Sequence, residues 1–299
     1  MFFGKSVESK DVRGLVVPLL TPLNEDLSLD FISFKTHVSW LMNRGVKNFF
    51  ILSPFGEQEF LSREQKQELI IYAKEALPKK INLIVGCFGE TPDLITESVS
   101  FAQRYSKQCV VNVPFSALTN EISFIDFFEE LFNQTKADFF LYNNPFLFKR
   151  NIPVVGFDKI AGWERLLGVI DYSRNIDYFK ILSKYKQALS LFQEADELFF
   201  DSTGFCEGFA PQLSNIYPRF FVESKEKVPA LDYVGLVHKQ SDFSSFVRDY
   251  FPLHSRIQSA KYLLAQNGVM QEFYHSALGV LSNQQKEKLT SLQKEKEFA

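Results

Sequence analysis

A closed (β/α)₈ barrel followed by a helical extension is the fold that this sequence predicts. Short apolar runs alternate along the chain with segments whose apolar residues recur at helical spacing. Such runs are typical of parallel strands covered by helices, and their spacing of roughly 30 residues leaves room for one helix each. Eight runs favour closure into a barrel. They are 15–20, 49–52, 81–87, 109–113, 139–142, 166–170, 189–192 and 208–210.

The helices of the first half have clear start and stop signals. The segment 30–44 carries its apolar residues on one helical face. Ser62, with Gln65 three residues later, forms a capping-box pattern, and Pro78 ends that helix. Two further helices of this half are expected at 91–105 and 120–133.

The second half is less regular, because the expected helices after the fifth, sixth and seventh strands are short. The pattern by itself therefore leaves an open, doubly wound sheet as an alternative. From residue 230 onward the chain is helical and has no strand signals. We divide the chain into a barrel, 1–229, and a C-terminal helical bundle packed on it, 230–299.

Composition and charge exclude several classes of protein. The formal net charge of −3 argues against nucleic acid or an anionic membrane as a partner, since both need a clustered basic face. No stretch approaches the ~20 apolar residues of a membrane span, and the N-terminus has no apolar signal region. Cys87, Cys109 and Cys206 form no CxxC pair, which argues against a disulfide framework or a zinc knuckle. We expect a cytoplasmic protein.

Metal and cofactor motifs are missing from the sequence. The histidines fall on expected helices without the spacing of metal ligands, and they are His37, His238, His254 and His275. No glycine-rich phosphate loop precedes a helix. We therefore expect neither a metal site nor a cofactor.

Candidate site residues follow from the expected barrel, whose active site lies at the C-terminal ends of the strands. Tyr142 ends the fifth expected strand and is the candidate catalytic residue, although a phenol, with a pKa of about 10, needs partners to transfer a proton. The candidate ligand-binding residues are Ser53, Phe55, Gly56, Glu57, Asn143, Asp171, Phe209 and Ala210.

Structural roles are the alternative for several of these residues. Gly56 would serve the backbone of a strand-to-helix turn, while Glu57 and Asp171 would brace neighbouring loops. Tyr142 would have a structural role in the barrel and no role in proton transfer. Ile170 would fill an interior layer of the barrel, where branched aliphatic residues dominate.

Six segments carry a resemblance to a known family. "SPFGE" (53–57) stands where that family has Gly-Thr-Thr-Gly-Glu, "YNNP" (142–145) matches Tyr-Asn-X-Pro, and "GVIDYS" (168–173) stands where it has Gly-Ile/Val-Lys-Asp-X-Ser. The other three segments are "GLVVPLLTPL", "CEGFAPQLSNIYP" and "IQSAKYLLAQNG". In this order they resemble the dihydrodipicolinate synthase and N-acetylneuraminate lyase family of class I aldolases. The resemblance runs nearly end to end and favours the closed barrel.

The resemblance implies Schiff-base chemistry that this sequence is not equipped to perform. In the family, a lysine of the sixth strand attacks pyruvate or a related 2-oxo acid as a neutral amine. Ile170 stands at that position and has no lone pair. The synthases use a proton relay, and its strand-five tyrosine is retained here as Tyr142. The two other members of the relay, a threonine and a tyrosine, correspond to Pro54 and Ser116, and Phe55 stands where the family has the threonine that follows the relay threonine.

A second departure concerns the substrate carboxylate. The arginine that binds it in the synthases corresponds to Leu147, although the lyase branch also has an apolar residue there. Lys149 and Arg150 are nearby cations that could take its place. The pocket is therefore expected to be more apolar and narrower than an aldolase needs for a charged 2-oxo acid.

Three functions remain open. We expect a barrel protein that has lost Schiff-base chemistry and binds a small ligand or regulates a partner. The first alternative is an active lyase or synthase on a 2-oxo acid such as pyruvate, acting through a displaced amine; Lys149, Lys159 and Lys180 are poor candidates for that amine.

The second alternative is a structural or interaction protein whose pocket is plugged by aromatic residues, namely Phe55, Phe115 and Phe209. The resemblance also implies a homo-oligomer, a dimer or tetramer, with Phe115 or Ser116 near a subunit boundary.

Overall fold

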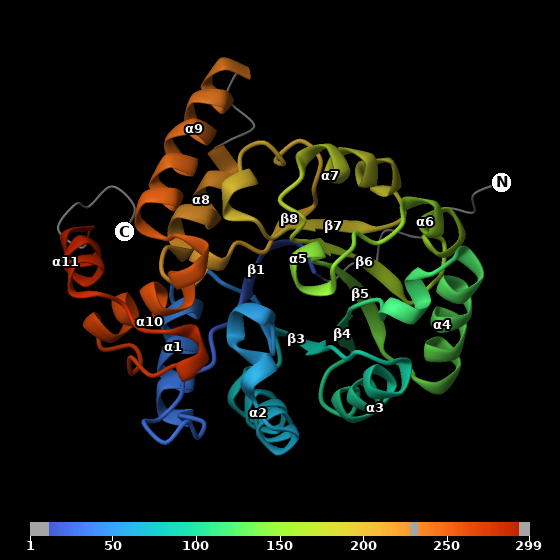
Figure 1. The fold of residues 1–299 in the computed structure, drawn as a ribbon, viewed down its shortest axis with the longest axis horizontal. Helices are drawn as coiled ribbons and strands as arrows, with labels where there is room; N and C mark the ends of the chain where they lie inside the picture. The colour runs from blue at the N-terminus through green and yellow to red at the C-terminus, as the bar shows by residue number, and fades with distance from the viewer. Residues whose placement is uncertain (1–11, 228–232, 293–299) are drawn as a thin grey trace.

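The computed structural model describes residues 12–227 and 233–292, which form a closed barrel of eight parallel strands. Each strand pairs with the next in chain order, and the last returns to the first. The strands are β1 (Gly14–Pro18), β2 (Asn48–Ile51), β3 (Asn82–Cys87), β4 (Gln108–Val111), β5 (Asp138–Asn143), β6 (Leu166–Asp171), β7 (Ser190–Gln193) and β8 (Gly208–Phe209). Figure 1 shows the strands at the centre with helices around them. The predicted (β/α)₈ barrel is confirmed, and the doubly wound alternative is wrong.

The interior of the barrel is filled by side chains. Successive residues of a strand point alternately inward and outward, so each strand contributes every second residue to the interior. One buried cluster gathers these residues, among them Val16, Phe50, Ile84, Val110, Phe140, Tyr142, Ile170, Phe192 and Ala210. The register places Ile170 between Tyr142 of β5 and Phe192 of β7. The interior is therefore a packed core and not a channel.

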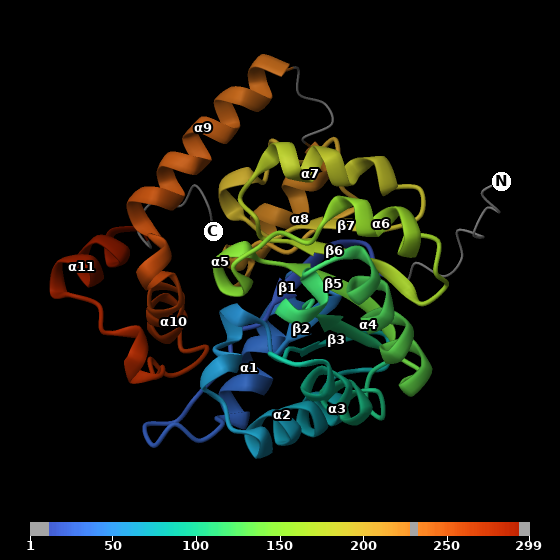
Figure 2. The same ribbon diagram turned by 45° about the vertical axis from the view of Figure 1, so that its right-hand side comes forward.

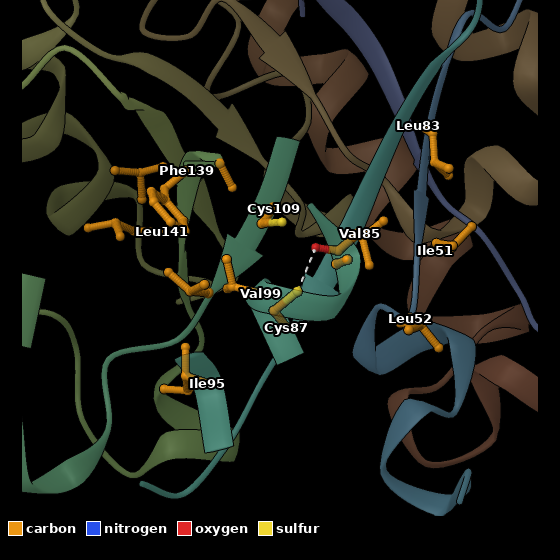
Figure 3. Close-up of a cluster of buried hydrophobic side chains, with 14 of the residues drawn as sticks. Ile51, Leu52, Leu83, Val85, Cys87, Ile95, Val99, Cys109, Phe139 and Leu141 are labelled. Atoms are coloured by element: carbon orange, nitrogen blue, oxygen red, sulfur yellow. Dashed lines mark hydrogen bonds between the residues drawn. The ribbon is translucent and has the colours of Figure 1, made fainter. Parts of the chain in front are cut away.

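A second core lies between the barrel and its surrounding helices. Figure 3 shows part of it, where Cys87 of β3 and Cys109 of β4 face Ile95 and Val99 of helix α3 (Pro92–Ala102). Both cysteines are buried and free. They act here as small apolar residues.

The helices of the first half begin at the residues that the sequence indicates. Ser62 and Gln65 form the predicted capping box at the start of α2 (Arg63–Ala76), in which each side chain accepts from the other residue's backbone N–H. Thr91 caps α3, with Pro92 at its first position. The other two helices of this half are α1 (Phe31–Met42), capped by Asp30, and α4 (Glu121–Gln134), capped by Asn120.

The helices of the second half are short, as expected. They are α5 (Pro145–Phe148), α6 (Val154–Ile160) and α7 (Ile176–Leu182).

The seam between β8 and β1 is narrow. β8 has two residues, and only Gly14 and Leu15 of β1 pair with it. Asn215 reinforces this seam from beyond β8, because its side chain accepts from Leu20 N at 3.1 Å and donates to Pro18 O at 2.9 Å. One asparagine thus links segments that lie almost 200 residues apart.

The last helices gather on one flank of the barrel. They are α8 (Pro218–Lys227), α9 (Tyr233–Tyr250), α10 (Arg256–Gln266) and α11 (Asn283–Leu292). Figures 1 and 2 both show α9, α10 and α11 on the side of α1, away from α4. Phe209 of β8 shares a buried cluster with Phe243 of α9 and Leu263 of α10. The predicted boundary between residues 229 and 230 lies outside the described residues.

Among helices within 12–227 and 233–292, none has the length and apolar character needed to cross a membrane.

Candidate functional site

Tyr142 lies at the C-terminal end of β5, inside the barrel and almost completely buried. Ile170 of β6 is its direct neighbour in the sheet and belongs to the same apolar cluster. Aromatic rings enclose the phenol. The ring centroids of Phe88, Phe50 and Phe148 lie 5.3, 6.2 and 6.3 Å from its own.

These rings differ from those that the plugged-pocket hypothesis names. Phe55 is buried beneath helix α10 with Leu264, and Phe209 packs in the cluster of the C-terminal helices. Phe115 is 58% exposed, with the Arg150 guanidinium 4.8 Å from its ring centroid. None of the three belongs to the cluster around Tyr142. The covering rings come instead from the loop after β3, which carries Phe88, and from α5, which ends at Phe148.

Glu194 follows β7 and is the acidic partner of Tyr142. It is fully buried, and Gln212 donates to its Oε1 at 3.3 Å. Burial, with the nearby charges of Asp196 and Asp171, raises the pKa of Glu194 to about 8. Burial also raises the pKa of Tyr142 well above its usual value, and the charge of Glu194 raises it further. The carboxyl is therefore largely protonated near neutral pH.

Two oxygens of this pair lack partners. Neither Tyr142 Oη nor Glu194 Oε2 has a hydrogen-bond partner within 3.5 Å in the described part of the chain, although the two side chains are close enough to shift each other's pKa. Arg174 Nε and Glu197 Oε2 are buried without a partner in the same region. The ends of β5, β6 and β7 thus hold four buried polar atoms of a kind that is normally paired with protein groups or with ordered water.

Asp171 has a bracing role and does not face Tyr142. Its carboxylate accepts from Asn143 Nδ2 at 2.6 Å and from Ser173 Oγ at 2.8 Å. Asn143 in turn accepts from Ile152 N at 2.9 Å. Burial raises the pKa of Asp171 to about 6, although these hydrogen bonds oppose the shift. Asn143 and Asp171, both predicted to bind ligand, thus tie the loops after β5 and β6 together.

A buried charge cluster lies beyond Glu194. Arg256 of α10 contacts Asp196 at 3.3 Å and Glu197 at 2.5 Å, and Arg174 contacts Glu197 at 3.3 Å. Burial raises the pKa of Asp196 to about 7 despite the Arg256 charge. Two cations therefore balance two carboxylates, and neither forms an ion pair with Glu194 within 4 Å.

The turn after β2 is braced by a different ion pair. Ser53, Phe55 and Gly56 are buried in it, and Thr21 Oγ1 donates to Gly56 O at 2.6 Å. Glu57 adopts a left-handed backbone with φ of 59°.

The Glu57 carboxylate forms a buried ion pair with Lys261 of α10 and accepts from His275 N at 2.9 Å. Lys261 also donates to Phe273 O at 2.8 Å. These contacts fit the bracing alternative for Glu57.

Sequence reasoning missed Glu194, Arg174 and Arg256. A usable signal was present for the first, because a cluster of acidic residues (Glu194, Asp196 and Glu197) directly follows an apolar strand. Arg256 has no comparable signal, since it reaches the site from α10. Of the predicted residues, the structure brings Ala210 and Ile170 to Tyr142 and leaves the Ser53–Glu57 turn in a separate network.

A hollow of about 290 Å³ adjoins this region between α2 and α3. Phe88 lines it together with Leu52, Cys87 and Phe101, and Arg63 and Lys66 contribute charge. Phe88 therefore separates the hollow from Tyr142.

Within the described ranges, no group of three or more His, Cys, Asp or Glu side chains is arranged to hold a metal ion.

Comparison with known proteins gives one consistent result. The model of the dihydrodipicolinate synthetase family matches residues 11–296. The chain is similar to the 4-hydroxy-tetrahydrodipicolinate synthase of Chelativorans sp., with 24% identity over 302 residues that cover 94% of this chain and 97% of that one. It is also 24% identical to 4-hydroxy-tetrahydrodipicolinate synthase 2 of Clostridium acetobutylicum over 161 residues, which cover 54% of this chain and 56% of that protein.

A solved structure shows the same fold. Dihydrodipicolinate synthase from Bacteroides thetaiotaomicron superposes with a TM-score of 0.85 at 21% identity, covering 94% of this chain and 98% of that one.

Proposed function

The chain belongs to the dihydrodipicolinate synthetase family, a lyase family, and from this premise we propose that it has lost Schiff-base chemistry and binds a small ligand at the strand ends. The observation that carries the proposal is Ile170, which lies beside Tyr142 where the family resemblance puts the reactive lysine. An isoleucine cannot attack a carbonyl.

A displaced amine is poorly supported. Among the lysines whose side-chain burial the structure describes, Lys261 is the one that is fully buried, and burial lowers its pKa. Its nitrogen is held by Glu57 and by the Phe273 carbonyl, in the turn after β2. An amine engaged in this way is not free to attack a substrate.

Ligand binding is supported by the unsatisfied atoms at the ends of β5 and β7. A barrel that had become purely structural would gain stability by replacing Glu194, because a buried carboxyl without a full set of partners is costly. Tyr142 Oη and Glu194 Oε2 are suited to hold one polar group of a small molecule.

The test is reductive trapping. The protein is incubated with pyruvate and borohydride, and the intact mass is measured. We expect no adduct. A stoichiometric adduct on any lysine would contradict the proposal and favour an active lyase or synthase.

Two variants make the result interpretable. Ile170→Lys is expected to restore trapping, since it places an amine beside Tyr142, while turnover stays negligible until Pro54 and Ser116 are also changed. Ile84→Lys is the matched control, because Ile84 occupies the same interior cluster on β3. Trapping by both variants, or by neither, would contradict the assignment of Ile170.

We also propose a homo-oligomer with Phe115 near the subunit boundary. Phe115 is 58% exposed on the loop after β4, and the Arg150 guanidinium lies over its ring. Light scattering at micromolar concentration tests this. We expect a dimer or tetramer, and a monodisperse species of the 34.6 kDa chain mass would contradict it.

A further inference from the structure

The pair formed by Tyr142 and Glu194 defines which ligand chemistry the strand ends can accept. Both side chains are at least nine-tenths buried, and each has an oxygen without a hydrogen-bond partner in the described residues. Phe192 of β7 and Tyr142 of β5 both belong to the interior cluster, and Glu194, which directly follows β7, interacts with the Tyr142 side chain.

The charge around the pair is negative. Asp171 on β6 and Asp196 after β7 both act electrostatically on Glu194. Two cations of this region are already paired, Arg256 with Asp196 and Glu197, and Arg174 with Glu197. A carboxylate ligand, such as a 2-oxo acid, would therefore meet like charge at this place.

The side chains that enclose Tyr142 at the strand ends are aromatic. Phe88 and Phe148 pack on Tyr142, and their ring centroids lie 6.2 Å apart. Ring faces attract a cation within about 6 Å, and they also accept an aliphatic chain.

Space for a ligand requires one ring to move. Phe88 is half-buried and also lines the hollow of about 290 Å³ between α2 and α3. Rotation of its side chain toward that hollow would uncover Tyr142 without unfolding the barrel.

We propose that the strand ends of β5 and β7 bind a small primary ammonium ion, with its nitrogen between Tyr142 Oη and Glu194 Oε2 and its carbon chain against Phe88 and Phe148. This inference rests on the proposed function and names the ligand class of that site. An ammonium group supplies donors to both oxygens and the positive charge that Glu194 lacks, since the described ion pairs of Arg174 and Arg256 go to Asp196 and Glu197.

The ionisation of Glu194 gives the binding a pH dependence. Burial holds its pKa at about 8, and Tyr142, Asp171, Asp196 and Gln212 are the groups that act on it. An alkylammonium ion stays charged to about pH 10. Binding should therefore strengthen as the pH rises from 6 to 9.

The experiment compares three probes that share a carbon skeleton: propylammonium chloride, propan-1-ol and sodium propionate. Their affinities are measured by calorimetry at constant ionic strength and pH 8.5. We expect propylammonium to bind at least tenfold more tightly than either other probe. Glu194→Gln should remove this preference, while Glu90→Gln, which changes an exposed carboxylate, should keep it.

Phe88→Ala is the second variant, because it opens the space over Tyr142 without touching the charge. It should bind propylammonium at least as tightly as the natural chain and retain the preference. Equal or tighter binding of propionate, an unchanged preference in Glu194→Gln, or no binding of propylammonium to either the natural chain or Phe88→Ala would overturn the inference. Trapping with pyruvate is a separate readout, so failure of the proposed function is distinguishable.

Discussion

Two buried glutamates at the strand ends have their charges balanced in opposite ways. Glu57, after β2, meets Lys261 of α10 and a backbone N–H, so its charge is compensated inside the protein. Glu194, after β7, has one amide donor, an unsatisfied oxygen and acidic neighbours. Both cations come from α10, but Lys261 pairs directly with Glu57, whereas Arg256 pairs with Asp196 and Glu197 and not with Glu194. The difference shows that a helix can supply positive charge to a region and still leave one buried carboxyl there without a direct counter-charge.

The largest effect is expected from breaking the buried ion pair between Glu57 and Lys261. Lys261→Met would leave the Glu57 carboxylate buried without its cation, and breaking a buried pair costs about 3–5 kcal/mol. Urea unfolding measures this as a lower midpoint. Lys286→Met is the control, because the ion pair of Lys286 with Glu272 is partly exposed and its loss should cost less than about 1 kcal/mol. Similar losses of stability in both variants would show that burial does not make the Glu57–Lys261 pair more important than the exposed one.

Neutralising Glu194, which has no direct counter-charge, should instead stabilise the folded protein. The pKa of Glu194 is raised to about 8 in the folded state, so its protonated form favours folding. That contribution is fully present below the unfolded pKa of about 4.3 and is lost as the pH rises through 8. The natural chain should therefore lose stability between pH 5 and 8, with Asp171 and Asp196 adding the same trend at about 6 and 7.

Glu194→Gln isolates the share of that one carboxyl. The variant should be more stable than the natural chain at pH 8, by on the order of a few kcal/mol, and should show a shallower decline with pH. Thermal unfolding at several pH values is the measurement. A decline as steep as that of the natural chain would mean that Glu194 is charged and compensated, as Glu57 is.

The overall fold could be predicted from the sequence because its signals are local. Apolar runs mark the strands, and residues such as Ser62 and Gln65 mark helix starts within one turn. Side chains that pair with residues far away in the sequence show no such local signal. Lys261 and Glu57 lie more than 200 residues apart, and no periodicity links them.

The candidate site was only partly predictable for the same reason. Tyr142 and Ile170 follow from strand positions and from the family resemblance. The covering rings do not, because a chain with 33 phenylalanines offers many equivalent choices. Phe88 and Phe148 are selected by the lengths and turns of two loops.

A smaller effect should come from the turn that carries Glu57. Thr21→Val removes the donor to the Gly56 carbonyl and leaves a buried acceptor unsatisfied, at a cost of about 1–2 kcal/mol. Thr36→Val is the comparison, since the Thr36 hydroxyl bonds to the helix backbone at an exposed position. Chemical denaturation should separate the two, and equal losses would show that the turn does not depend on this bond.

The smallest effect should come from an exposed ion pair between an arginine and a glutamate. Arg63 and Glu97 join α2 to α3, and both side chains are more than half exposed. Arg63→Gln should cost less than about 1 kcal/mol, because solvent screens the charges. A larger loss of unfolding free energy would mean that exposure does not govern the worth of ion pairs in this barrel.

The seam held by Asn215 governs when a newly made chain can finish folding. Residue 215 must leave the ribosome before β8 and Asn215 can dock on β1, and synthesis runs at about 5–20 residues per second, so β1 waits on the order of 10–40 s. During that interval β1 and the growing sheet present open edges to other nascent chains. Growing chains that stop short of residue 215 should therefore depend on chaperones, and this dependence should end once the seam forms.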